Sequence, residues 1–168
     1  ALIGRTQMTE FAFSGIGINP HQGTPVNPVT AALGLAPRIP GGSTSGGAVS
    51  VATGAAWAAL GTDTGGSIRI PAALQGLVGF KNTARLTPTE GAIPLSTTLD
   101  TVCAITRSVR EAVLLHEVLA DRPGLGPALI IHPDCVHTIR TLPALQHDDK
   151  RLTGRHYRTH TPTRKAVR

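Results

Sequence analysis

The 168-residue sequence has few cysteines, few aromatic residues and no long apolar run. It holds two cysteines and no CxxC pair, which excludes a disulfide framework. No stretch approaches the roughly 18 uninterrupted apolar residues of a membrane span. No basic-then-apolar signal segment opens the chain, so we expect a cytoplasmic protein that does not associate with membranes. Hydrophobic residues still make up 40% of the chain, which excludes complete disorder.

Acidic side chains are scarce only at the C-terminal end. Residues 1–135 carry eight basic and eight acidic side chains, whereas residues 136–168 carry eight basic and two acidic ones. The whole net charge of +6 therefore lies in the last part of the chain. We expect residues 146–168 to form a basic, disordered tail. Its single aromatic residue, Tyr157, favours a solvated tail over a nucleic-acid-binding one.

The apolar pattern predicts a few short elements. Glycines and prolines punctuate residues 1–40, which favours loops there, apart from a short helix over residues 8–13 capped by Thr9. A run of small apolar residues predicts a buried helix over residues 48–60. A short buried strand is predicted over residues 76–80.

An amphipathic helix is the clearest element of the sequence, over residues 108–120. Ser108 and Glu111 have the spacing of a capping box at its start. Its predicted apolar stripe consists of Val109, Val113, Leu114 and Val118.

Two serines flanked by glycines stand 24 residues apart: Ser43 in GGSTSGG and Ser67 in TDTGGSIRIP. A serine hydroxyl is a weak nucleophile that needs a nearby base. Glycines beside it let backbone N–H groups and substrate approach closely. Either motif alone is more often a simple turn or cap. GGSTSGG could also bind phosphate before a helix, although no Walker-type lysine follows it.

Read together, the motifs resemble the amidase signature family over residues 1 to 121. The resemblance lies in GGSTSGGAVSVATG, GTDTGGSIRIPAALQGLVGFK, PLSTTLD and TRSV, with GRTQMTEFAF and GTPVNP upstream. The form GGSTSGGA is more similar to the bacterial amidase and allophanate-hydrolase branch than to the tRNA-amidotransferase branch. The resemblance implies an α/β fold with a mixed central sheet flanked by helices, incomplete at both ends, and no metal or organic cofactor. Residues 122–145 match the family poorly.

The resemblance also implies a Ser–cis-Ser–Lys triad that hydrolyses small-molecule amides. Ser67 matches the nucleophile that forms the acyl-enzyme, and Ser43 matches the serine on a cis peptide that relays a proton. We therefore expect their hydroxyls to lie a few ångströms apart. The N–H groups of Thr64, Gly65, Gly66 and Ser67 match the oxyanion hole.

The resemblance also concerns charged residues: one charged pair is matched, and the catalytic lysine is not. Asp63 and Arg69 match a charged pair beside the nucleophile, which we interpret as structural. The family's catalytic lysine lies further upstream than the 42 residues that precede Ser43. None of the three lysines, Lys81, Lys150 and Lys165, matches it. We therefore expect a fragment that lacks the catalytic lysine and has negligible amidase activity on its own.

A non-catalytic truncated remnant is the rival interpretation, with a basic tail that could bind polyanions. The change in composition after residue 121 favours a frameshift between residues 122 and 146. His132, Cys135 and His137 have a spacing that could ligate a metal, but an ordinary loop is favoured without a fourth ligand.

Overall fold

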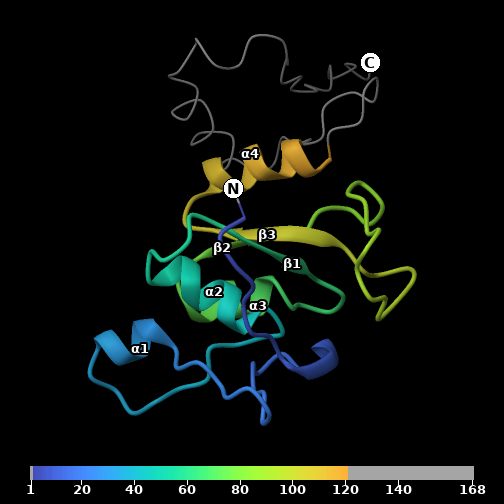
Figure 1. The fold of residues 1–168 in the computed structure, drawn as a ribbon. Coiled ribbons are helices and arrows are strands. Elements are labelled where there is room, and N and C mark those ends of the chain that lie inside the picture. The colour runs from blue at the N-terminus through green and yellow to red at the C-terminus, as the bar shows by residue number, and fades with distance from the viewer. Residues whose placement is uncertain (1, 121–168) are drawn as a thin grey trace, which may run out of the picture. The chain divides into compact units, whose positions relative to one another are not determined.

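The computed structural model of the chain describes residues 2–120 (Figure 1). The predicted segments 122–145 and 146–168, with His132, Cys135 and His137, lie outside the described residues. The elements in chain order are η1 (Glu10–Ala12), α1 (Pro28–Ala32), α2 (Ser45–Ala52), β1 (Ala59–Thr62), α3 (Arg69–Leu74), β2 (Val78–Phe80), β3 (Val102–Thr106) and α4 (Val109–Leu119). Among these residues, no helix is long and apolar enough to cross a membrane.

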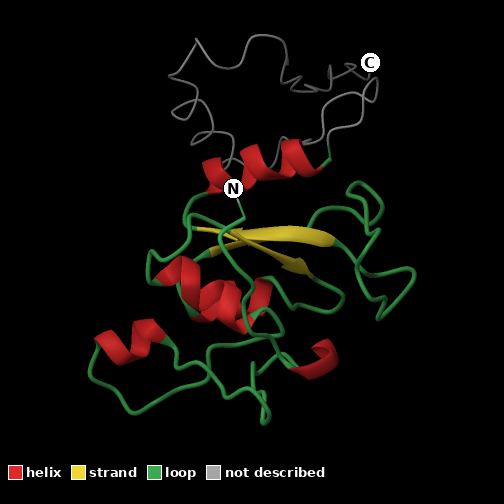
Figure 2. Ribbon diagram, in the orientation of Figure 1, coloured by secondary structure: helices red, strands yellow, loops and turns green. Residues whose placement is uncertain are grey.

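Three short strands form the centre of the described fold (Figure 2). β3 lies between β1 and β2 and is antiparallel to both, with Gly61 opposite Cys103 and Gly79 opposite Ile105. Helix α4 covers one face of this sheet, and α2 and α3 cover the other (Figure 1). The predicted α/β class, with helices flanking a central sheet, is thereby confirmed, but the sheet of the described residues is antiparallel throughout and not mixed.

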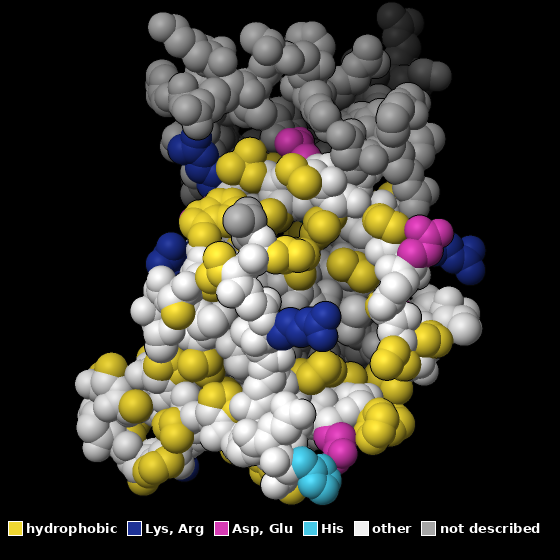
Figure 3. Space-filling model, in the orientation of Figure 1, with side chains coloured by type: hydrophobic (Ala, Val, Ile, Leu, Met, Phe, Trp, Pro, Cys, Tyr) yellow, Lys and Arg dark blue, Asp and Glu magenta, His cyan; other side chains and the backbone are white. Residues whose placement is uncertain are grey.

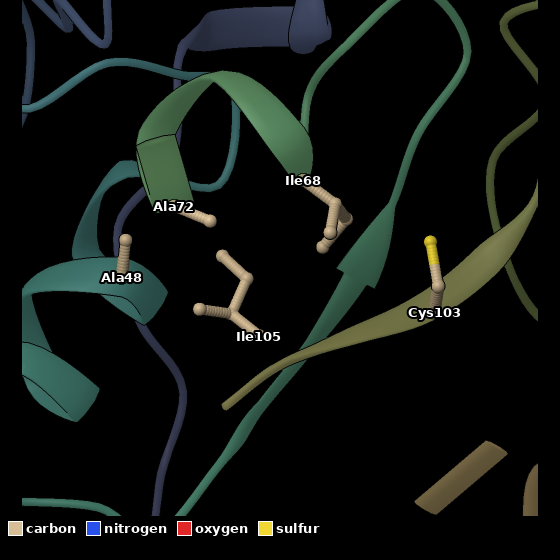
Figure 4. Close-up of a cluster of buried hydrophobic side chains, with 5 residues drawn as sticks. All are labelled: Ala48, Ile68, Ala72, Cys103 and Ile105. Atoms are coloured by element: carbon tan, nitrogen blue, oxygen red, sulfur yellow. The ribbon is translucent and has the colours of Figure 1, made fainter. Parts of the chain in front are cut away.

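The core lies between the sheet and the two helices α2 and α3. Its side chains come from Ala48 of α2, from Ile68 and Ala72 at α3, and from Cys103 and Ile105 of β3 (Figure 4). Cys103 and Ile105 are two positions apart, so both side chains point to the same face of the sheet. Burying a side chain such as Ile105 contributes roughly 1.5–3 kcal/mol. This small core joins the two helices that follow the serine motifs.

Two strand glycines allow those helices and their loops to lie very close to the sheet. A Cβ at Gly61 would lie 2.7 Å from Oγ1 of Thr44. A Cβ at Gly79 would lie 2.8 Å from the carbonyl oxygen of Ile68. Both distances are shorter than atoms tolerate, so only glycine fits. The serine loops before α2 and α3 are therefore seated directly on the same sheet face.

The helix predicted over residues 48–60 is wrong in its bounds. It begins earlier, at Ser45, and ends at Ala52. Gly54 then takes a left-handed conformation with φ of 78°, which ends the helix, and the chain enters strand β1. The apolar pattern of the sequence does not predict β1, because the small apolar residues of this strand suit a helix equally well.

The N-terminal region contains more structure than its glycines and prolines indicate. The helix predicted over residues 8–13 is a single 3-10 turn, and the side chain of Thr9 forms no capping hydrogen bond. Helix α1 was not expected. The side chain of Asn27 caps it by accepting hydrogen bonds from the N–H groups of Val29 and Thr30, and Pro28 takes the first helical position.

The helix predicted over residues 108–120 is confirmed. The buried strand predicted over residues 76–80 is present but shorter, at Val78–Phe80, and only half-buried. The capping box is present, with the Ser108 hydroxyl accepting from the Glu111 N–H and the Glu111 carboxylate accepting from the Ser108 N–H.

The predicted apolar stripe of α4 is wrong at two of its four positions, because Val109 and Val118 are exposed, whereas Val113 and Leu114 are half-buried. The helix instead buries Ala112 and His116, one turn apart. The His116 ring packs edge-on against Phe80 of β2, with 5.1 Å between ring centroids. Because Ala112 is small, it lets the helix lie close to the sheet.

Apolar side chains also lie on the surface of the described residues (Figure 3). Phe11 and Phe13 are 74% and 76% exposed, and Ile93 is 93% exposed. Large exposed apolar side chains in this number are typical of surfaces that contact other protein segments.

Candidate functional site

The two serine motifs lie side by side at the backbone level. The N–H of Thr44 donates a hydrogen bond to the carbonyl oxygen of Ser67 at 3.2 Å. The peptide bond between Gly42 and Ser43 is cis. Both serines are buried, Ser43 at 1% and Ser67 at 9% exposure. The fold thus brings together the two serine motifs that the sequence singles out.

The hydroxyl of Ser43 is buried and has no hydrogen-bond partner among the described residues. The backbone around it is firmly held, because its carbonyl oxygen accepts from the N–H groups of Thr9 at 2.9 Å and Ser45 at 2.8 Å. Two buried polar atoms of the N-terminal segment that bonds to this backbone, Nε2 of Gln7 and Oγ1 of Thr9, also have no hydrogen-bond partner among the described residues. Leaving a buried polar group unpaired costs about 1–3 kcal/mol. The Ser43 hydroxyl therefore has the full capacity to accept and to donate a proton.

Asp63 organises the turn that carries Ser67. This serine turn, residues 63–67, joins β1 to α3. The Asp63 carboxylate accepts hydrogen bonds from the N–H of Gly66 at 2.8 Å and of Ile68 at 3.2 Å. It also accepts from the N–H of Arg69 at 3.3 Å and from its guanidinium at 3.0 Å through both Nε and Nη2. Five donors converge on one carboxylate, which fixes the turn from inside.

The electrostatics of Asp63 follow from these bonds. Burial opposes ionisation of its carboxyl, but the hydrogen bonds from Arg69 and from the backbone N–H of Ile68 outweigh it and lower the pKa of Asp63 to about 2. In return, the carboxylate raises the pKa of Arg69. The carboxylate is therefore ionised at neutral pH.

The amide groups of the serine turn are not equivalent. The N–H of Gly66 is already bonded to Asp63, so three of the four predicted oxyanion donors stay open. Within residues 2–120, the N–H groups of Thr64, Gly65 and Ser67 have no hydrogen-bond acceptor. A Cβ at Gly65 would meet no atom within 4 Å, whereas one at Gly66 would lie 2.7 Å from Cδ1 of Ile70. The turn is thus closed at Gly66 and open at Gly65.

Two residues that sequence reasoning did not assign to the site hold this turn from the other side. The Thr64 hydroxyl donates to Asp100 at 2.5 Å, and the second oxygen of Asp100 accepts from the N–H groups of Leu95 and Ser96. Burial opposes ionisation of Asp100, but these bonds lower its pKa. The Lys81 ammonium donates to the Thr64 carbonyl oxygen at 2.7 Å. Their only sequence signal is their place in the matched motifs GLVGFK and PLSTTLD.

No described lysine lies at the Ser43 hydroxyl. The Lys81 ammonium is bound to the carbonyl oxygens of Thr64 and Leu99 and lies 3.4 Å from the Asp63 carboxylate. Lys150 and Lys165 lie outside the described residues. Among residues 2–120, the serine pair therefore has no lysine base.

Comparison with known proteins identifies the family to which the chain is similar. The family model Amidase matches residues 1–125. The chain is 48% identical over 110 residues to the 2-amino-5-chloromuconic acid deaminase of Comamonas testosteroni, covering 66% of this chain and 23% of that protein. It is 45% identical over 120 residues to one of the glutamyl-tRNA(Gln) amidotransferase subunits of Campylobacter fetus, covering 71% of this chain and 25% of that protein. The chain spans about a quarter of the length of these curated relatives.

A solved structure agrees with these matches. The native peptide amidase of Stenotrophomonas maltophilia is 39% identical, with a TM-score of 0.62, over 74% of this chain and 26% of that one. Because relatives of more than one branch match at similar identity, the placement closer to the bacterial amidases and allophanate hydrolases stays a prediction. The family model over residues 1–125, together with the similarity to solved amidases, shows that the chain belongs to the amidase signature family.

Proposed function

We propose that this chain carries the nucleophile part of an amide-hydrolase site. In this proposal, Oγ of Ser67 attacks the carbonyl carbon of a small-molecule amide, the C–N bond breaks, and the amine leaves with a proton. The acyl group stays on Ser67 until water releases it as a carboxylic acid. The observation that carries the proposal is the bond between the two serine motifs beside the buried, unpartnered hydroxyl of Ser43.

Ser43 would relay the proton. The Ser67 hydroxyl must lose its proton as it attacks, and a second hydroxyl can accept that proton while donating its own. The backbone of Ser43 is firmly held, and its hydroxyl has no hydrogen-bond partner among residues 2–120, so it would be available for this task. The base that receives the relayed proton would be a lysine from outside the described residues.

The open N–H groups of the serine turn would bind the oxyanion. Attack by Ser67 turns the substrate carbonyl into a tetrahedral centre with a negative oxygen. The N–H groups of Thr64, Gly65 and Ser67 have no other acceptor in the described part of the chain. Asp63 and Arg69 would act as scaffold, since both are used in holding the turn.

A boronic acid tests the nucleophile without requiring a base for turnover. An aryl boronic acid added to the full chain should become tetrahedral on Ser67, which boron NMR detects. Ser67→Ala should abolish the tetrahedral signal. Ser50→Ala is the matched control, because Ser50 is a serine in α2 whose hydroxyl bonds only within its helix, to the Gly47 carbonyl. A tetrahedral signal that persists in Ser67→Ala would contradict the assignment and favour the non-catalytic remnant.

Turnover by the chain alone should be negligible. A general base typically contributes about 10²–10⁴-fold to the rate, and no described lysine lies at Ser43. Hydrolysis of simple amides should therefore be the same in the chain and in its Ser67→Ala variant. Turnover that disappears in Ser67→Ala would show that the chain itself supplies a base.

A further inference from the structure

We propose that Lys81 is a positioning residue that orients the N–H of Gly65 toward the oxyanion; the inference rests on the function proposed above. Lys81 directly follows strand β2. Its ammonium donates to the carbonyl oxygens of Thr64 at 2.7 Å and Leu99 at 3.2 Å. The Asp63 carboxylate lies 3.4 Å away. These three acceptors match the three donors of an ammonium group.

The orientation of the Thr64–Gly65 peptide follows from the first of these bonds. This peptide is not among the cis bonds of the described residues, so it is trans. In a planar trans peptide the C=O and the N–H point in opposite directions. An ammonium that holds the Thr64 oxygen therefore turns the Gly65 N–H away from Lys81. That N–H has no acceptor within residues 2–120, and the space beside Gly65 is open.

A simple ion pair with Asp63 accounts less well for the position of Lys81. Asp63 already accepts five hydrogen bonds, all of 3.3 Å or less, and its contact with Lys81 is longer at 3.4 Å. The shortest contact of the ammonium is with the Thr64 carbonyl, and its side chain is only 19% exposed. A cation on this oxygen also polarises the peptide and makes the Gly65 N–H a stronger donor. Asp100 holds the side chain of the same residue, Thr64.

The test compares three forms of the full chain: wild type, Lys81→Met, and Lys81→Cys alkylated with bromoethylamine to restore an ammonium. Alkylated wild type controls for reaction at Cys103 and Cys135. Arg5→Met is the matched control, because it removes one positive charge from an exposed residue outside the site. The residual dipolar coupling of the Gly65 N–H measures its orientation without any ligand. The affinity for the aryl boronic acid measures the donor in use.

We expect Lys81→Met to change the Gly65 coupling while the couplings of β1 and β3 stay the same. Boronate affinity should fall by about tenfold or more, because a lost oxyanion donor costs about 10²–10³ in rate in a well-studied protease. The alkylated cysteine variant should restore both readouts, and Arg5→Met should change neither. An unchanged Gly65 coupling in a folded Lys81→Met chain overturns the inference.

Two further outcomes keep the inference separate from the proposed function. Equal boronate affinity in wild type and Lys81→Met overturns the role of Lys81 and leaves Ser67 as nucleophile. No boronate binding in wild type overturns the proposed function, while the coupling still reports whether Lys81 sets the peptide. If Lys81→Met does not fold, the wild-type chain decides: a scalar coupling between the Lys81 ammonium nitrogen and the Thr64 carbonyl carbon is expected, and its absence overturns the inference.

Discussion

Replacing Asp63 by asparagine should destabilise the chain by about 2 kcal/mol at neutral pH and by much less at pH 2. The carboxylate is fully buried and accepts five hydrogen bonds from Gly66, Ile68 and Arg69. Asparagine keeps the size of the side chain but places an NH2 group where donors converge. The variant therefore resembles the protonated form of Asp63, in which the charge is lost.

The magnitude comes from the pKa of Asp63, which is about 2 against an ordinary value of 3.8. At about 1.4 kcal/mol for each pKa unit, the ionised form gains roughly 2.4 kcal/mol, which we reduce to about 2 because the Arg69 side chain is 51% exposed and screened by solvent. A folded pKa below the unfolded one stabilises the protein above about pH 4 and loses effect as pH falls. At pH 2 about 0.4 kcal/mol remains.

Urea unfolding followed by circular dichroism measures this effect between neutral pH and pH 2. The difference in unfolding free energy between wild type and Asp63→Asn should shrink as the pH falls from about 4 to about 2. Glu90→Gln, which removes an exposed carboxylate, should show no such change. A deficit of Asp63→Asn that is as large at pH 2 as at pH 7 would refute the reasoning, because it could not then arise from the charge.

Three other substitutions or reagents test the geometry. Gly65→Ala should fold like the matched variant Gly4→Ala, because neither Cβ meets an atom within 4 Å. Only Gly65→Ala should weaken boronate binding, because only position 65 lies in the serine turn. Burial raises the pKa of the Cys103 thiol to about 12, so peptide mapping should find it unlabelled by a thiol reagent at pH 8 unless the chain is unfolded. Ser108→Ala should lower the unfolding free energy by about 1 kcal/mol in urea titrations, because it removes the capping box with Glu111.

The local parts of the fold could be predicted from the sequence. The capping box of α4 depends on residues three positions apart, and strand β2 follows a glycine turn, so short-range patterns are enough. The exact bounds of α2 and the existence of β1 could not be predicted in this way. Strand β1 pairs with β3, forty or more residues later in the chain, and its small residues carry no strand signal of their own.

The candidate site could also be predicted only in part. Ser43 and Ser67 stand out because glycines surround them, and the fold brings their motifs together. Lys81 and Asp100 could not be assigned to the site beforehand, because their partners on Thr64 are reached only through the tertiary fold. A sequence motif also cannot predict that Asp63 binds the Gly66 N–H, because it does not distinguish one amide of a glycine turn from another.

The two ends of the long connection between β2 and β3 are fastened to the serine turn. Lys81 bonds to Thr64 at one end, and Asp100 bonds to it at the other, while Lys81 also bonds to Leu99. The connection is therefore a lobe that is closed at its base. The length of the chain within it should not affect the distance between Ser43 and Ser67. Within the connection, the Thr87 hydroxyl also donates to the Val102 carbonyl, so lengthening or shortening residues 88–94, between Thr87 and Leu95, should change the lobe at little entropic cost. A loop exchange within residues 88–94 should therefore leave the geometry of the serine turn unchanged.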